Sequence, residues 1–477
     1  MSNSSSLASK RIQALLDENS FVEIGALVQA RATDFNMKQN DTPADGVITG
    51  YGVIDGNLVY VYSQDASVLS GSVGEMHAKK IVKLYELAMK TGAPVIGLID
   101  SAGLRLQEAT DALNGFGEIY LKQALASGVI PQITAVLGTC GGGLAMIPTL
   151  TDFTFMESDK AKLFVNAPNA IAGNEISKCN TASATFQSEE SGIVDVVGSE
   201  DEIMVQIRQL VSLLPASNED DMSFADCSDD LNRVCADLED AVEDTSIVLS
   251  TIADNNEFFE VKADYAKSMV TGFIKLNGVT VGCVANRSKV YDDNAEVVAT
   301  YDAALSVIGC EKAADFITFC DAFNIPVLSL TNVKGYEATI CCEKKIAKAT
   351  AKLTYAFANA TVPKVNVIIG SAFGSAYIAM NSKSIGADLT MAWPSAQIGM
   401  MDAKLAAKII CDGEGSEAID ACAAEYATLQ TSVDSAASRG YVDQIVEPCD
   451  TRKYVIGAFE MLFTKREDRP DKKHGTV

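Results

Sequence analysis

A pattern of residues in the first half of this chain recurs in the second half. The segment 93–100, APVIGLID, returns as IPVLSLTN at 325–332, an offset of 232 positions. With the same offset, IPQITAVLG at 130–138 returns as VPKVNVIIG at 362–370. A repeat of this length predicts two homologous domains rather than an array of short units. The chain of 477 residues is long enough for both.

The repeat fixes the expected domain boundaries. We expect one domain over residues 1–218 and its homologue over residues 248–477. The segment 219–247 lies between them, and its part 219–244 holds eleven Asp or Glu residues against a single Arg233. Such a run is typical of a solvated linker, and an acidic docking segment is the alternative.

Apolar runs and helical stretches alternate within each half. The first half predicts strands at 95–100 and 133–137 and helices at 117–126 and 144–150. The second half repeats this order, with the four elements at 327–330, 347–359, 365–369 and 376–381. Strand, helix and strand in succession predict parallel sheets with right-handed crossovers, so we expect an α/β fold in two copies.

The chain is poor in histidine, a residue that often carries acid–base catalysis and binds metals. It has two histidines, His77 and His474, and its twelve cysteines contain no Cys-x-x-Cys pair. Triad hydrolases, zinc ribbons and multi-histidine metal sites are therefore disfavoured. We expect no metal in this chain.

Charge and hydropathy narrow the possible partners. The formal net charge of −25 argues against binding to nucleic acid. The stretch 123–151 has no charged residue, but its glycines and prolines favour a buried strand and turn over a membrane span. The first residues, MSNSSSLASK, lack the apolar core of a signal peptide, so we expect a cytoplasmic protein.

Two small-residue turns occupy equivalent positions in the repeat. GTCGGG at 138–143 and GSAFGSA at 370–376 each follow a predicted buried strand and precede a predicted helix. Backbone N–H groups at a helix start are unpaired and can stabilise an oxyanion without a histidine. Tight packing alone would explain one such turn, but two at matched positions favour a duplicated site for two reacting carbonyls.

Three other residues invite a chemical role. His77 lies at a predicted helix start, where a structural histidine is the better interpretation than a catalytic base. Cys140 has no histidine near it in the sequence and is better explained as a packing residue. Lys90 follows Ala-Met, as in a biotin attachment site, but it ends a predicted helix rather than lying in a hairpin, so we reject it as a biotin anchor.

Over nearly its whole length the sequence resembles the carboxyltransferase subunits of biotin-dependent acyl-CoA enzymes, the family of propionyl-CoA carboxylase β and methylmalonyl-CoA decarboxylase α subunits. Ordered motifs carry this resemblance: DGVITGYG at 45–52, GSVGEMHAKK at 71–80, DSAGLRLQE at 100–108, CDAFNIP at 320–326 and KKHG at 472–475. The family fold is a pair of crotonase-type β-β-α superhelix domains, in keeping with the repeat.

The resemblance implies a reaction and the residues that serve it. Carboxybiotin, carried by another protein, would release its carboxyl group beside the α-carbon of a short acyl-CoA such as propionyl-CoA or acetyl-CoA. The biotin nitrogen would take the α-proton, and decarboxylases would run the reverse. The resemblance assigns the catalytic N–H groups, the CoA side and the biotin side to these positions: Gly142 and Gly143 for the thioester oxyanion, Ser375 and Ala376 for the biotin ureido oxygen, Ala102, Gly103 and Arg105 for CoA, and Phe373 and Gly374 for biotin.

The resemblance also implies partners and leaves alternatives. It implies a biotin carboxyl carrier protein, a biotin carboxylase subunit or a membrane decarboxylase β subunit, and a dimer or hexamer with shared sites. The chain could thus be the α subunit of a sodium-pumping decarboxylase, peripheral to a membrane. A crotonase-type hydratase or isomerase would need paired carboxylates, and only Asp152 closely follows the first turn; a non-catalytic acyl-CoA-binding subunit is the third alternative. Ser375 replaces a family glycine, and Ile378 replaces an Asp frequent in propionyl-specific relatives.

Overall fold

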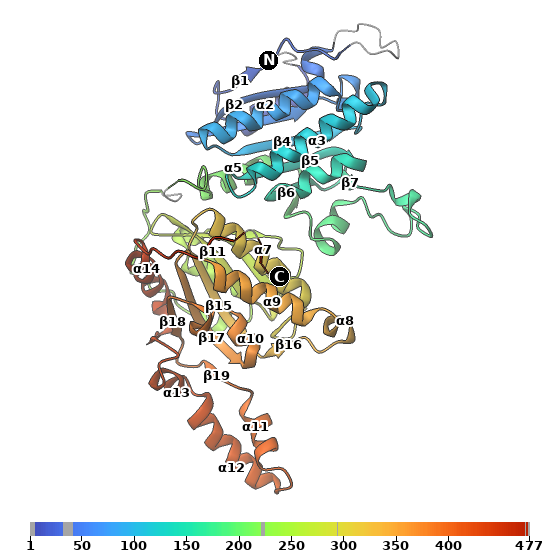
Figure 1. Ribbon diagram of the computed structural model, residues 1–477. Coiled ribbons are helices and arrows are strands. Elements are labelled where there is room, and N and C mark those ends of the chain that lie inside the picture. Colours follow the sequence, from blue (N-terminus) through green and yellow to red (C-terminus); the bar gives the residue numbers. More distant parts are fainter. Residues whose placement is uncertain (1–4, 32–41, 221–224, 293, 473, 476–477) are drawn as a thin grey trace. The chain divides into compact units, whose positions relative to one another are not determined.

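The computed structural model describes residues 5–31, 42–220, 225–292, 294–472 and 474–475. The chain divides into two compact units, Met1–Ser223 and Phe224–Val477. Figure 1 draws the first in blue to green and the second in green to red. Lys473 of the terminal motif and part of the acidic segment, 221–224, lie outside the described residues. No helix among the described residues is both long and apolar enough to cross a bilayer.

The first unit is built on one mixed sheet with the order β1-β2-β3-β4-β5-β6-β8, and β7 pairs with the end of β5. Pairing is antiparallel up to β3 and parallel from β3 onward. Its strands are β1 (Val22–Ile24), β2 (Val47–Ile54), β3 (Asn57–Gln64), β4 (Val95–Ser101), β5 (Gln132–Gly141), β6 (Phe153–Glu157), β7 (Lys162–Phe164) and β8 (Val196–Gly198). Its α-helices are α1 (Leu7–Leu15), α2 (Glu75–Thr91), α3 (Ala109–Ala126), α4 (Met146–Thr149) and α5 (Glu200–Leu213).

The second unit repeats this plan with the order β20-β18-β17-β15-β11-β10-β9, and β19 pairs with the end of β17. Its strands are β9 (Phe258–Val261), β10 (Met269–Leu276), β11 (Val279–Asn286), β12 (Lys289–Tyr291), β13 (Val297–Thr300), β14 (Ala304–Leu305), β15 (Val327–Val333), β16 (Gly335–Tyr336), β17 (Lys364–Phe373), β18 (Leu389–Ala392), β19 (Gln397–Gly399) and β20 (Gln444–Ile445). Its α-helices are α6 (Thr245–Ile252), α7 (Val307–Ala322), α8 (Ile340–Glu343), α9 (Ile346–Asn359), α10 (Gly374–Ala379), α11 (Ala403–Ile410), α12 (Ser416–Tyr426), α13 (Val433–Ser438) and α14 (Thr451–Leu462).

The two units share details of register as well as strand order. The β4–β5 ladder is interrupted between Ile99 and Ser101, and the β15–β17 ladder is interrupted between Thr331 and Val333. These positions are related by the repeat offset. In each unit two long helices, α2 with α3 and α7 with α9, lie side by side across one face of the sheet (Figure 1). The predicted duplicated α/β architecture is therefore confirmed.

Buried lysines show that the repeat extends into the polar interior. The Lys80 ammonium donates to the carbonyl oxygen of Ala44 at 3.0 Å and also to that of Val47. Its repeat counterpart, Lys312, donates to backbone carbonyls of Lys262 and Met269, each at 2.7 Å. Burial lowers the pKa of Lys80 to about 8. Such an ammonium is tolerated in the interior only because carbonyl acceptors replace its water.

The second unit includes most of the acidic segment that we expected to be a solvated linker. Cys235 and Leu238 are buried, and the N–H of Cys235 donates to the carbonyl of Cys449 at 2.9 Å. The Arg233 guanidinium donates to two backbone carbonyls near the end of α6. Apolar residues between the acids pack on the core of this unit, so the described part of the segment from residue 225 onward is folded.

Helix boundaries differ from the sequence prediction at the first turn. The helix expected at 144–150 is a 3-10 turn over Gly142–Ala145 followed by the single turn of α4. The short length has a local cause, because two glycines begin this segment and Pro148 lies within its last turn. The helix expected at 376–381 begins earlier and spans Gly374–Ala379.

Candidate functional site

The first small-residue turn opens at the carboxyl end of β5. Gly142 adopts a φ of +64°, in the left-handed region that favours glycine. A Cβ built on Gly142 would meet no atom within 4 Å. The N–H groups of the first helical residues have no partner within a helix. Gly143 is exposed, so the turn offers donors on an open face.

The second turn has the same backbone geometry. Gly374 follows β17 and adopts a φ of +62°. Ser375 is exposed and Ala376 is buried in the first turn of α10. A Cβ on Gly374 would lie 3.3 Å from the Met400 carbonyl oxygen. The structure therefore places Gly142 with Gly143, and Ser375 with Ala376, at equivalent helix starts.

The loop after β4 lies against the first turn. Gly103 has a φ of +96°, and a Cβ built on it would lie 3.5 Å from the Gly141 carbonyl oxygen. The N–H of Ala102 donates to the Ser70 carbonyl at 3.0 Å, and the Gly103 N–H donates to Ser101 Oγ at 3.1 Å. The structure thus brings the expected CoA-side residues Ala102 and Gly103 next to the expected oxyanion turn.

The side chain of Arg105, which we expect on the CoA side, is enclosed within the protein. It is 2% exposed. Its guanidinium donates to Asp45 at 2.7 Å, to Glu108 at 2.8 Å, and to both the hydroxyl and the carbonyl of Ser72. Burial raises the pKa of Asp45, and the nearby guanidinium of Arg105 opposes that shift. All three guanidinium nitrogens are used inside the protein, so the Arg105 side chain fixes the conformation of the loop.

His77 and Cys140 are structural residues, as predicted. His77 is fully buried; its Nδ1 lies 3.0 Å from the Asp45 carbonyl and its Nε2 lies 3.2 Å from the Gln64 amide nitrogen. Burial lowers the pKa of His77 to about 3, so the ring is neutral and enclosed. Burial raises the pKa of Cys140, which keeps its sulfur a protonated thiol. Neither group is a base or nucleophile for this turn.

Asp152 lies at the opposite end of β5 from the first turn. Its carboxylate accepts the N–H of Gln132, the first residue of β5, at 2.8 Å. A strand of this length separates its two ends by roughly 30 Å at about 3.3 Å per residue. Burial raises the pKa of Asp152 to about 7. This distance removes the one nearby carboxylate that the hydratase alternative had.

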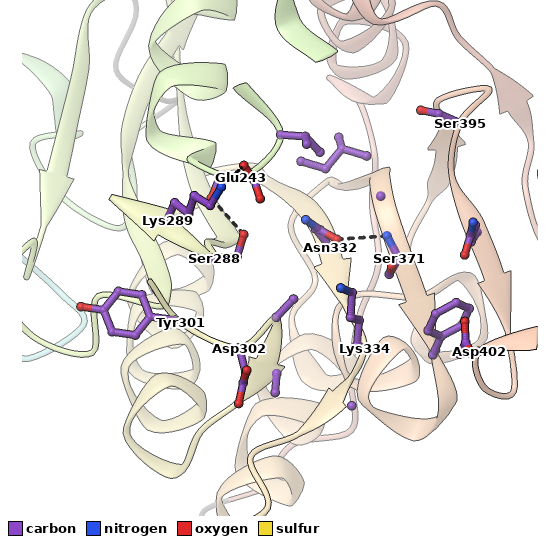
Figure 2. Close-up of a pocket in the computed structure, with 18 of the residues that line it drawn as sticks. Glu243, Ser288, Lys289, Tyr301, Asp302, Asn332, Lys334, Ser371, Ser395 and Asp402 are labelled. Atoms are coloured by element: carbon purple, nitrogen blue, oxygen red, sulfur yellow. Dashed lines mark hydrogen bonds and ion pairs between the residues drawn. The ribbon is translucent and has the colours of Figure 1, made fainter. Parts of the chain in front are cut away.

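A cavity of about 1020 Å³ lies beside the second turn. Phe373, expected on the biotin side, lines it, as do Asn332 near the end of β15, Lys334, and Tyr336 of β16. Figure 2 shows Asn332 beside Ser371, whose N–H donates to the Asn332 side-chain oxygen at 3.0 Å. These three residues were not expected in a site from the sequence, although their repeat counterparts, Asp100, Ala102 and Leu104, lie within the 100–108 motif of the first half.

The cavity walls carry charges of both signs. Lys289 pairs with Glu243 at 2.7 Å (Figure 2). The Asp402 carboxylate accepts the N–H groups of Lys404 and Leu405 at the start of α11. In the described part of the chain, no group of three or more His, Cys, Asp or Glu side chains is placed to hold a metal ion.

Comparisons with known proteins agree along the whole chain. A family model described as the carboxyl transferase domain matches residues 1–477. Methylmalonyl-CoA decarboxylase subunit alpha of Propionigenium modestum is 40% identical over 488 residues, covering 98% of this chain and 92% of that protein. The propionyl-CoA carboxylase beta chain of Roseobacter denitrificans is 40% identical over 484 residues, covering 98% and 93%.

A solved structure matches the fold equally well. Transcarboxylase 12S, described as a hexamer assembly with hydrolysed methylmalonyl-coenzyme A bound, superposes with a TM-score of 0.92. It is 37% identical, and the match covers 98% of this chain and 92% of that one. The likeness therefore includes both units.

Proposed function

This chain belongs to the carboxyl transferase family, as an enzyme of the biotin-dependent propionyl-CoA carboxylase and methylmalonyl-CoA decarboxylase kind, and we propose that it moves a carboxyl group between carboxybiotin and the α-carbon of methylmalonyl-CoA or propionyl-CoA. Relatives of both reaction directions are equally similar to it, at 40% identity. The two directions share one chemical step, so the proposal covers both. A separate biotin carrier protein is the proposed partner.

The observation that carries this proposal is the pair of equivalent turns. Gly142 and Gly374 have φ values of +64° and +62° at the same position of the repeat. One carboxyl transfer involves two carbonyl groups that each gain negative charge, and two donor sites match that need. Removal of one such donor costs about 3 to 4 kcal/mol in other acyl-transfer enzymes.

We assign the first turn to the acyl-CoA. The N–H groups of Gly142 and Gly143 would hold the thioester oxygen as the enolate forms. Ala102 and Gly103 lie against this turn and would contact the CoA thiol arm through their backbone. Because His77 is neutral and buried and Cys140 is protonated, neither acts as the base. The α-proton is then removed by the second substrate.

We assign the second turn to biotin, with the N–H groups of Ser375 and Ala376 holding its ureido oxygen. The backbone fits a ring that approaches closely, because Gly374 has no Cβ and a Cβ there would crowd the Met400 carbonyl. Phe373 lines the adjoining cavity and gives an apolar wall. When bound, carboxybiotin supplies the carboxyl group and a ring nitrogen that accepts the α-proton.

Purified protein tests this proposal directly. Methylmalonyl-CoA or malonyl-CoA is incubated with free biotin or a biotinylated carrier, and the CoA products are separated by chromatography. We expect loss of the acyl carboxylate only when biotin is present. Absence of turnover with every acyl-CoA tested, in the presence of the carrier, would overturn the proposal. Hydration of crotonyl-CoA without biotin would instead support the hydratase alternative.

We also propose an oligomer in which one subunit's acyl-CoA side meets another subunit's biotin side. The two assigned turns belong to different compact units, and the transfer requires the acyl-CoA and the biotin to meet. This requirement supports the proposal. Transcarboxylase 12S, the structural relative, is described as a hexamer assembly. Native mass spectrometry of the full chain measures the subunit number, and a monomer with full activity would contradict the proposal.

A further inference from the structure

We infer that the hydroxyl groups of Tyr336 and Ser375 form a donor relay that adds a third hydrogen bond to the biotin-side oxyanion site; this inference rests on the proposed function. The Tyr336 hydroxyl donates to Ser375 Oγ at 2.9 Å. Ser375 is also the residue whose N–H we assign to the ureido oxygen. Its hydroxyl oxygen is therefore only three covalent bonds away from a backbone donor of the site.

The Ser375 hydroxyl, at the end of the relay, has a hydrogen that it can donate to a ligand. A serine hydroxyl that accepts one hydrogen bond keeps its own O–H for donation. Among the described residues, the Ser375 O–H meets no acceptor, and the side chain is exposed at the turn. Donation from Tyr336 polarises this O–H and strengthens the bond that it can give to an anion.

Both members of the pair are held in place by the fold. Tyr336 ends β16, where it pairs with Leu305 of β14, and the next N–H, that of Glu337, donates to the Leu305 carbonyl at 3.0 Å. Tyr336 also lines the cavity beside the second turn. The tyrosine thus reaches Ser375 from a fixed strand and faces the space that we assign to the biotin ring.

The repeat supplies an internal comparison. The counterparts of Tyr336 and Leu305 are Leu104 and Val73, and these two residues form the equivalent parallel bridge in the first unit. The counterpart of Ser375 is Gly143. The first turn therefore keeps the same backbone but lacks both of these hydroxyls. The tyrosine hydroxyl that does contact it, that of Tyr120, donates to the Gly143 carbonyl and not to a serine, so the relay distinguishes the biotin side from the acyl-CoA side.

The difference suits the two ligands. A thioester carbonyl oxygen is a weak hydrogen-bond acceptor. A ureido oxygen is a stronger acceptor, because two nitrogens donate electrons into its carbonyl group, and it can take a further donor. Tyr336 and Ser375 are accordingly a positioning residue and an additional catalytic donor for the biotin half of the reaction.

Single substitutions in the full chain test the relay by the binding of biocytin, which is biotin joined to a lysine, titrated by saturation-transfer NMR. We expect Ser375→Ala to weaken biocytin binding about three- to tenfold, the value of one hydrogen bond. Tyr336→Phe should weaken it about two- to fivefold, and should add nothing in the Ser375→Ala background. Tyr441→Phe, which alters an exposed tyrosine outside the cavity, is the matched control and should bind like the unmodified chain.

Turnover separates the relay from a purely structural contact. Both variants should raise the KM for biotin and leave the KM for methylmalonyl-CoA and the urea midpoint of unfolding unchanged. Equal biocytin binding by the unmodified chain and both variants would overturn the relay, whatever the turnover. Equal weakening of both KM values would also overturn it. A biocytin difference without any biotin-dependent turnover would support the relay as a binding device and overturn the proposed reaction.

Discussion

Arg105 Nη1 lies 2.7 Å from Asp45 Oδ1, and both side chains are almost completely enclosed. The same carboxylate group accepts the backbone N–H of His77 at 2.8 Å. This pair therefore ties the loop after β4 to the start of α2, and the backbone of the CoA side depends on it. A buried arginine can therefore decide whether the site forms.

Replacing Arg105 should destabilise the first unit. Arg105→Ala leaves Asp45 and Glu108 buried without their cation, which costs about 3 to 5 kcal/mol for a buried pair. Arg31→Ala is the matched control, because Arg31 is itself exposed and pairs with the half-buried Glu75 and the exposed Asp111, and it should change the urea midpoint little. Urea midpoints for both variants provide the measurement. Equal small losses would contradict the structural role of Arg105.

Gly142→Ala should impair the acyl-CoA half of the reaction while the protein remains folded. The new methyl group meets no protein atom within 4 Å, but it projects into the space assigned to the thioester. The left-handed φ costs a further ~1 to 2 kcal/mol. We expect kcat to fall on the order of tenfold to a hundredfold with a higher KM for methylmalonyl-CoA. Gly117→Ala, in α3 with open space around it, should keep full activity.

Gly374→Ala should produce the opposite pattern of Michaelis constants. Its methyl group would lie 3.3 Å from the Met400 carbonyl, so the start of α10 must shift. We expect a higher KM for biotin and an unchanged KM for methylmalonyl-CoA. Steady-state kinetics with each substrate varied in turn distinguish the two glycines. Identical changes in both variants would contradict the assignment of one turn to each substrate.

Asp152 predicts a dependence of stability on pH. Its pKa is about 7 in the folded protein, against about 3.9 in an unfolded chain. The folded state therefore binds more protons between these values, and stability falls as pH rises from about 4 to about 7. Asp152→Asn stays neutral and keeps an acceptor for the Gln132 N–H. We expect it to gain about 1 to 4 kcal/mol over the unmodified chain across this window.

Urea midpoints at pH 4.5, 6 and 8 measure this difference. The gain of Asp152→Asn should grow between the first two values and level off above pH 7. Asp55→Asn, which alters a side chain that is 57% exposed, serves as the control and should show no such growth. A gain that is constant with pH would contradict the raised pKa of Asp152.

The sequence predicted the parts of the fold that depend on local pattern. The apolar runs after Pro94 and Pro131 became β4 and β5, because proline and glycine bound them on either side. The glycines of the two turns were found because the repeat aligned them. Three features were out of reach because they depend on contacts between distant residues: the burial of Arg105 against Asp45, the position of Asp152 at the far end of β5, and the bond from Tyr336 to Ser375.

The acidic segment contains periodic apolar residues that predict packing on a core, although its charge suggested a solvated linker. Leu231, Cys235, Leu238 and Val242 recur at spacings of four, three and four among the acids. All four belong to or pack on the hydrophobic core of the second unit. The periodic apolar residues were a better guide to packing than the run of Asp and Glu, most of whose described members are exposed, although Asp244 is buried.

The repeat-related buried lysines Lys80 and Lys312, whose ammonium groups donate to backbone carbonyls, have a practical consequence. They are only 6% and 4% exposed, so an amine-reactive reagent cannot reach either one while its unit is folded. The rate of modification of Lys80 therefore measures the unfolding of the first unit, and the rate of modification of Lys312 measures the unfolding of the second. Peptide mapping after labelling would follow the unfolding of two homologous domains separately within one chain, without an introduced probe.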